Sequence, residues 1–116
     1  SNARRAFEEA IRLNPRLAWA HNGYGHVLKA LGAPREALMA FKRAARHQPG
    51  EVIYWNNLTE TLIELDEHAE ALSAAQQAVR IAAADSSAWA KLGQVLRYLE
   101  QYDEALDAYT YLDFSQ

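Results

Sequence analysis

The chain has 116 residues, the length of one domain and enough to form a hydrophobic core that needs no covalent cross-links. Its formal net charge is −3, so no bulk electrostatic attraction to nucleic acid or anionic lipid is expected. Cysteine is absent, which excludes disulfides and thiolate metal sites, and no apolar run approaches the roughly 20 residues of a membrane-spanning helix.

The first predicted helix covers residues 3–14 and stops at an Asn-Pro pair. Its segment AFEEAIRLNP is amphipathic and is interpreted as the second half of a two-helix unit, so the chain opens in the middle of a repeat. Ser1, Asn2 and Ala3 are typical of the remnant of a cleaved expression tag. We therefore assign residues 1–3 to a tag remnant and residues 4–116 to a single domain.

Six more helices are predicted, because apolar residues recur at i, i+3, i+4 and i+7 in each segment. They cover residues 18–31, 35–48, 52–65, 69–83, 86–99 and 103–114. Short polar joints, LGAPREA, LDEHAEA and LEQYDEA, connect them in pairs. The joint RIAAADSSAW lacks the Asn-Pro stop, and alanine is the best helix former, so the fifth helix is expected to run one or two residues long.

A period of 34 residues relates the pairs without any insertion. Ala37, Phe41 and Ala44 align with Ala71, Ala75 and Ala78, then with Ala105, Tyr109 and Leu112. In the preceding helices, His21, Trp55 and Trp89 align, as do Gly25, Thr59 and Gly93. We expect Ala37, Ala71 and Ala105 to face these last three residues where the two helices of a pair cross closely, because a glycine inside a helix needs a steric reason.

This pattern resembles the tetratricopeptide repeat family, and the likeness covers nearly the whole chain. The best match is Trp89, Leu92, Gly93, Leu96, Ala105 and Tyr109. The resemblance implies an all-α, right-handed α-solenoid of antiparallel helix pairs with about seven helices. Its units are a truncated repeat at residues 4–15 and full repeats at 18–51, 52–85 and 86–116. The second repeat departs from the pattern at Thr59, Ala75 and Ala83.

The resemblance also implies that the first helices of the pairs line a concave groove that binds a partner. Amide side chains can hydrogen-bond an extended peptide backbone, and aromatic side chains are common anchors in binding sites. The expected groove residues are Trp19, Asn22, His26, Lys29, Asn56, Asn57, Glu60, Lys91, Gln94, Arg97 and Tyr98. Gly23 is read either as room for a ligand backbone or, as we favour, as a tolerated defect of its helix.

Several other functions are not supported by the residues. One subclass of the family grips the carboxylate of chaperone tails, but at its positions only Asn57 matches outright and Lys91 in part. No two histidines are four apart on a helix, so no helical metal site is expected, and no catalytic set or cofactor loop is present. The acidic balance and the period of 34 argue against RNA binding.

We therefore predict a non-catalytic protein–protein interaction module that holds a peptide or a helix in the groove, with no nucleic acid or membrane partner. The alternatives are a substrate-presenting segment of a larger transferase-type enzyme, or a structural spacer or dimerisation unit. Both ends look uncapped, with Phe7 and Ile11 at one end and Tyr111 and Phe114 at the other, so self-association through the end helices is expected. The sequence does not identify the compartment, although we favour a cytoplasmic one.

Overall fold

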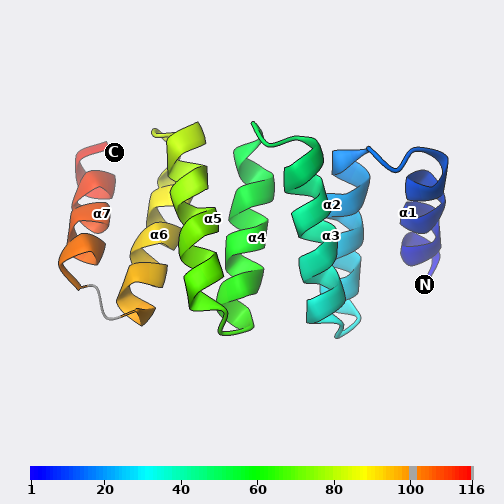
Figure 1. The fold of residues 1–116 in the computed structure, drawn as a ribbon, viewed down its shortest axis with the longest axis horizontal. Coiled ribbons are helices and arrows are strands. Elements are labelled where there is room, and N and C mark those ends of the chain that lie inside the picture. The colour runs from blue at the N-terminus through cyan, green and yellow to red at the C-terminus, as the bar shows by residue number, and fades with distance from the viewer. Residues whose placement is uncertain (100–101, 116) are drawn as a thin grey trace.

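A computed structural model describes residues 1–99 and 102–115 and shows seven helices within these ranges (Figure 1). They are α1 (Asn2–Leu13), α2 (Ala18–Ala30), α3 (Pro34–His47), α4 (Val52–Glu64), α5 (His68–Ile81), α6 (Ser86–Tyr98) and α7 (Tyr102–Ser115). Their ends agree with the predicted ones within two residues. Part of the third joint, at residues 100–101, and the side chain of Phe114 lie outside what the structure describes, so the expectations for them stay predictions.

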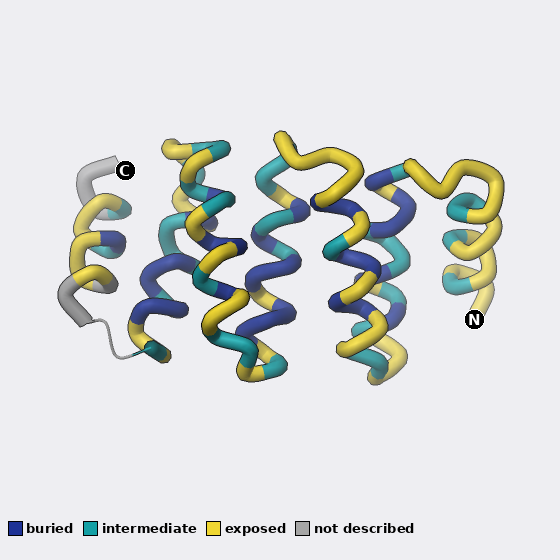
Figure 2. The backbone as a smooth tube through the Cα atoms, viewed as in Figure 1, coloured by how far each residue is buried: buried dark blue, intermediate teal, exposed yellow. Residues whose placement is uncertain are grey.

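The helices pack in chain order as antiparallel pairs, α2 with α3, α4 with α5, and α6 with α7, while α1 packs against α2. Successive pairs stack side by side, so the molecule is elongated, 45 × 25 × 20 Å, with its two termini at opposite ends (Figure 1). Buried positions face the interior between the helices, and exposed positions lie on the outer surfaces (Figure 2). The predicted all-α solenoid of helix pairs is confirmed. Among the described residues, no helix combines the length and apolarity that crossing a bilayer requires.

The turn inside each of the first two pairs has a residue in the left-handed region. Gly32 has φ +81° and Asp66, which is 34 residues later, has φ +59°. At Gly32 the backbone N–H groups of Gly32 and Ala33 donate to the carbonyls of Lys29 and Leu28, at 3.0 and 2.9 Å. This pattern satisfies the last carbonyls of α2 and stops the helix. Aspartate tolerates the same backbone at a small cost, so the two turns are alike despite the different residues.

The expectation that the fifth helix runs long is wrong. α5 ends at Ile81, the same repeat position as the end of α3. The carbonyl of Ala83 accepts hydrogen bonds from the indole of Trp89 at 2.7 Å and the hydroxyl of Tyr111 at 2.5 Å. The side chain of Asp85 caps the start of α6 by accepting from the Ser87 N–H at 2.9 Å. These bonds hold the joint in a turn, against the helical preference of the alanines.

The same joint bond recurs in every repeat. Trp55 Nε1 donates to the Pro49 carbonyl at 2.8 Å, as Trp89 does to Ala83. His21 takes the place of tryptophan in the first repeat, with its Nε2 2.7 Å from the Pro15 carbonyl. Because the carbonyl can only accept, His21 must carry a proton on Nε2. Ring N–H groups at one repeat position therefore tie each helix pair to the chain that precedes it.

The small residues of α2 and α6 make room for aromatic rings of the partner helices. A Cβ on Gly25 would lie 2.6 Å from Phe41 Cε1, and a Cβ on Gly93 would lie 2.9 Å from Tyr109 Cε1. In the middle repeat the sizes are exchanged, because Thr59 stands where the glycine would be and Ala75 where the ring would be. Thr59 and Ala75 are both fully buried.

Both sequence-based interpretations of Gly23 are also wrong. A Cβ at Gly23 would overlap the ring of Phe7, so this glycine makes room for the Phe7 ring from α1. It is neither an opening for a ligand backbone nor a defect without consequence. The close approach is what packs α1 onto α2.

Candidate functional site

The first helices of the three pairs, α2, α4 and α6, form one layer of the molecule, and we call its outward surface the A face. Two of its largest exposed side chains are Trp19 and Ile53, which are 57% and 55% exposed. They are 34 residues apart and lie in the first turns of α2 and α4. In α6 the equivalent residue is Ser87. One edge of the A face therefore presents a tryptophan and an isoleucine to solvent.

Amide side chains join α2 to α4 in the middle of the A face. Asn57 Nδ2 donates to Asn22 Oδ1 at 2.9 Å and lies 3.3 Å from His26 Nε2. The His26 ring packs edge-on against Phe41, with ring centroids 5.1 Å apart. Asn22, His26 and Asn57 thus lie together, and their hydrogen bonds link the first two repeats.

Charged side chains follow toward the carboxyl ends of these helices. Lys29 Nζ and Glu64 Oε1 form an ion pair at 2.9 Å between α2 and α4. Between α4 and α6 there is a small hollow of about 160 Å³ lined by Glu60, Ile63, Glu64, Lys91 and Gln94. Among the described residues, neither Glu60 nor Lys91 has an ion-pair partner.

The last two expected residues, Arg97 and Tyr98, end α6. Both are exposed, and the Tyr98 ring stacks on His68 of α5, with centroids 4.7 Å apart and planes at 11°. The stacking holds Tyr98 at the side of the A face next to α5. Within the described part of the chain, Arg97 forms no ion pair.

Asn56 does not lie on the A face with the others. It is only 8% exposed, and its Nδ2 donates to Asp85 Oδ2 at 3.3 Å. Its Oδ1 is buried without a hydrogen-bond partner in the described structure. Asn56 therefore supports the joint before α6, and a ligand on the A face would not reach it.

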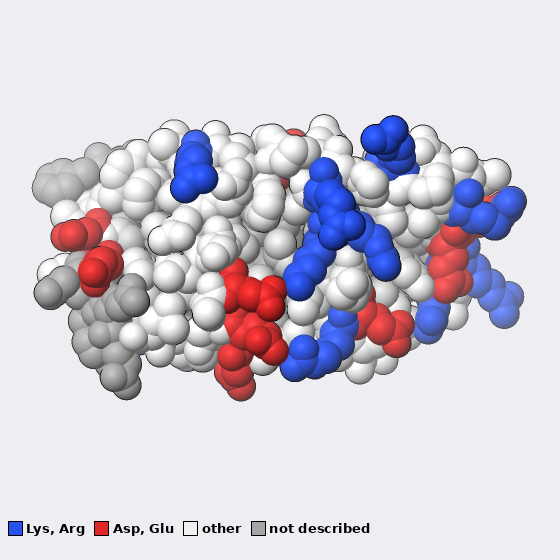
Figure 3. All heavy atoms as spheres, in the orientation of Figure 1, with Lys and Arg blue, Asp and Glu red and all other residues white. Residues whose placement is uncertain are grey.

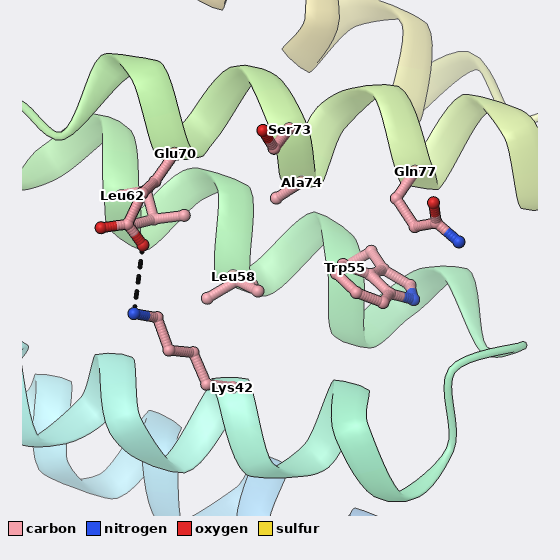
Figure 4. A pocket seen from close by; sticks show the side chains of 8 residues that line it. All are labelled: Lys42, Trp55, Leu58, Leu62, Glu70, Ser73, Ala74 and Gln77. Carbon is pink, nitrogen blue, oxygen red and sulfur yellow. Dashed lines mark ion pairs between the residues drawn. The ribbon is translucent and has the colours of Figure 1, made fainter.

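Sequence reasoning missed the hollows on the opposite surface. We call the outward surface of α1, α3, α5 and α7 the B face. Between α3 and α5, the floor of a hollow of about 370 Å³ includes Leu58 and Leu62 of α4, and the ion pair of Lys42 with Glu70 crosses it at 3.1 Å (Figure 4). The signal in the sequence is the alanine-rich α5, whose short side chains leave this space beside Trp55.

Two further hollows of the B face repeat this arrangement. One of about 560 Å³ lies between α5 and α7 over Trp89, and one of about 320 Å³ lies between α1 and α3 over His21. No group of three potential metal-ligating side chains occurs in the part of the chain that the structure describes.

The comparisons agree with this geometry. A family model described as a tetratricopeptide repeat matches residues 86–110. The matched segment resembles a tetratricopeptide repeat, and the whole chain has the fold of tetratricopeptide repeat structures. The match covers α6 and the first part of α7, the repeat in which the sequence pattern is most complete. No curated protein has a sequence that matches the chain.

Solved structures with the same fold cover almost the whole chain. MamA superposes with a TM-score of 0.89 at 21% identity, covering 97% of this chain and 66% of its own. YrrB, a TPR protein with an unusual peptide-binding site, has a TM-score of 0.87 at 25% identity, covering 99% and 59%. The second TPR of Spaghetti (RPAP3), solved with the HSP90 peptide SRMEEVD, has a TM-score of 0.81 at 18% identity, covering 93% and 99%. The present chain spans less than two thirds of MamA and of YrrB.

Proposed function

We propose that the chain is a protein–protein interaction module, without catalysis of its own, that binds an extended peptide or a helix on its A face. The observation that carries the proposal is the composition of this face. Trp19 and Ile53 expose large apolar surfaces at the same position of successive repeats. Uncovered aromatic and aliphatic side chains of this kind are typical anchors for a partner.

The rest of the A face supplies polar groups that fix a bound segment. Asn22, His26 and Asn57 already bond one another, so their positions are set before a ligand arrives. A preordered site loses less conformational entropy on binding. Lys91 and Gln94 line a hollow beside them and can bond a carboxylate or a carbonyl of the ligand.

The related structures support a peptide ligand. YrrB is described as having a peptide-binding site, and the second TPR of Spaghetti was solved with a peptide bound. The chaperone tail is not the ligand that we propose here, because the A face offers few converging cations. Lys29 is engaged by Glu64, and Asn57 is engaged by Asn22.

A selection from random displayed peptides of twelve residues tests the proposal. We expect peptides with an aromatic or aliphatic residue to bind with micromolar Kd. Trp19→Ala should weaken them at least tenfold, since a buried aromatic anchor is worth about 2 kcal/mol or more. Met39→Ala, which removes a residue 47% exposed on α3, is the matched control and should change the Kd less than twofold. If no peptide is selected, or if both variants weaken binding alike, the proposal is refuted.

A further inference from the structure

The hollow between α1 and α3 is lined by two arginines and two histidines. Its volume is about 320 Å³, at the small end of the range for ligand sites. Arg43, Arg46 and His47 of α3 line it, together with Ile11 of α1 and Pro15. No carboxylate lines it, although the whole chain carries a net charge of −3.

The cations around this hollow have no ion-pair partners, in contrast to their neighbours. Lys42, next to Arg43 in the chain, pairs with Glu70 at 3.1 Å, and Arg35 of the same helix pairs with Glu67 at 3.4 Å. Among the described residues, Arg43 and Arg46 form no such pair. On the face seen in Figure 3, Lys and Arg side chains gather over α3, while Asp and Glu side chains gather near the start of α5.

His47, which lines the hollow, lies close to other groups that can be positively charged. The His47 ring stacks on His21, with centroids 5.4 Å apart. Loss of hydration lowers the pKa of His47, and the nearby charges of His21, Arg16 and Arg46 lower it further. Cations near the carboxyl end of a helix interact favourably with its dipole, which is an alternative reason for this cluster. That interaction needs only one charge in the last turn of α3, and Arg16 and Arg43 lie outside that turn.

We propose that this hollow binds a phosphoryl group carried on a side chain of a partner segment. Guanidinium groups match the oxygens of a phosphoryl group in pairs, which a single ammonium cannot do. The volume exceeds what the charged group alone would fill, and Ile11 and Pro15 provide apolar surface for the carbon chain that bears it. The site lies on the B face, so it is independent of the proposed A-face function.

The test uses the 116-residue chain and three probes: inorganic phosphate, a short neutral peptide with one phosphoserine, and the same peptide with serine. Calorimetry gives the Kd, and the imidazole NMR signals of His47 report where binding occurs. We expect the phosphopeptide to bind with a Kd below 1 mM and to shift the His47 signals, and the serine peptide to do neither. Phosphate that binds as tightly as the phosphopeptide would overturn the proposed side-chain source and assign the hollow to a free anion.

Variants of exposed arginines distinguish phosphopeptide binding in this hollow from nonspecific electrostatic binding elsewhere on the surface. The double variant Arg43→Gln, Arg46→Gln should weaken phosphopeptide binding at least tenfold. Arg80→Gln, an exposed cation on α5, is the control and should change it less than twofold, as should Trp19→Ala on the A face. Circular dichroism checks that the variants remain folded. The proposal is overturned if His47 does not respond, or if the single Arg80 change has the effect of the double variant.

Discussion

In the second repeat, Thr59 replaces the glycine of the other repeats and Ala75 replaces their aromatic residue. We predict that these two replacements compensate each other in the packing, and a pair of substitutions can test this. Restoring the arrangement of the other two repeats requires Thr59→Gly and Ala75→Phe together. In the first repeat Phe41 lies directly over Gly25, where even a Cβ would be only 2.6 Å from the ring. We therefore expect each single variant to destabilise the chain and the double variant to recover.

The magnitudes follow from the burial of both positions. Thr59→Gly removes a buried methyl group and a hydroxyl that donates to the Trp55 carbonyl at 2.8 Å. The loss is about 2 kcal/mol, with roughly equal shares from packing and from the hydrogen bond. Ala75→Phe alone forces a ring against the threonine and costs about 1–3 kcal/mol. If the two effects were independent, the double variant would lose about 3–5 kcal/mol.

We expect the double variant to lie within about 1 kcal/mol of the starting protein, because the ring then fills the space over the glycine and gains its own burial. Urea unfolding followed by circular dichroism at equal protein concentration measures all four members of the cycle. The coupling energy should be about 2–4 kcal/mol, from the additive loss minus the observed one.

A matched control uses Thr61, which is also fully buried and donates its hydroxyl to the Asn57 carbonyl at 2.9 Å. Thr61 lies two residues farther along α4, on a different side of the helix from Thr59. Combined with Ala75→Phe, Thr61→Gly should give additive losses. Equal coupling in the two cycles, or no coupling at Thr59, would show that the exchanged sizes are not a compensated pair.

Three further predictions concern single hydrogen bonds and one turn. Trp55→Phe should lower the free energy of unfolding by about 1–2 kcal/mol in a urea titration, since Pro49 loses its indole donor; an unchanged value would argue against the joint bond. The Tyr24 hydroxyl, and then Arg4, lower the pKa of Glu8, so this stabilisation is present above the ordinary carboxyl range and is lost as pH falls through the lowered pKa. Tyr24→Phe should therefore raise the pKa of Glu8 in an NMR titration, and no change would contradict the assigned cause. Asp66→Gly should raise thermal stability by about 0.5–1 kcal/mol, because glycine adopts a positive φ without strain; a lower melting temperature would refute this.

The repeat and the helix pairs could be predicted from the sequence, because period and amphipathicity are local properties of the chain. The period of 34 placed Trp55 and Trp89 at one position, but it did not show that their indoles would bond the preceding joint. It placed Gly25 at a helix crossing, but not under Phe41, because the pattern does not say which side chain of the partner helix fills the space.

The site was predictable only in part, for a related reason. Trp19 is exposed as expected, since its position faces away from the neighbouring helix. Asn56 has the same kind of side chain as Asn57, yet it is buried against Asp85, which belongs to the next joint. The apolar pattern of a helix predicts which of its own faces is buried. The burial of Asn56 depends instead on the loop that precedes the following repeat.

The ring N–H bonds at the joints have a consequence for how such a chain can diversify. They are made by His21, Trp55 and Trp89 to backbone carbonyls, and these contacts do not use the side chains of the A face. These bonds attach each repeat to the preceding joint, in addition to the A-face contacts of Asn57 with Asn22 and of Lys29 with Glu64. Surface residues of α2, α4 and α6 that make no such contact can therefore be exchanged while the joints keep the spacing of the helices.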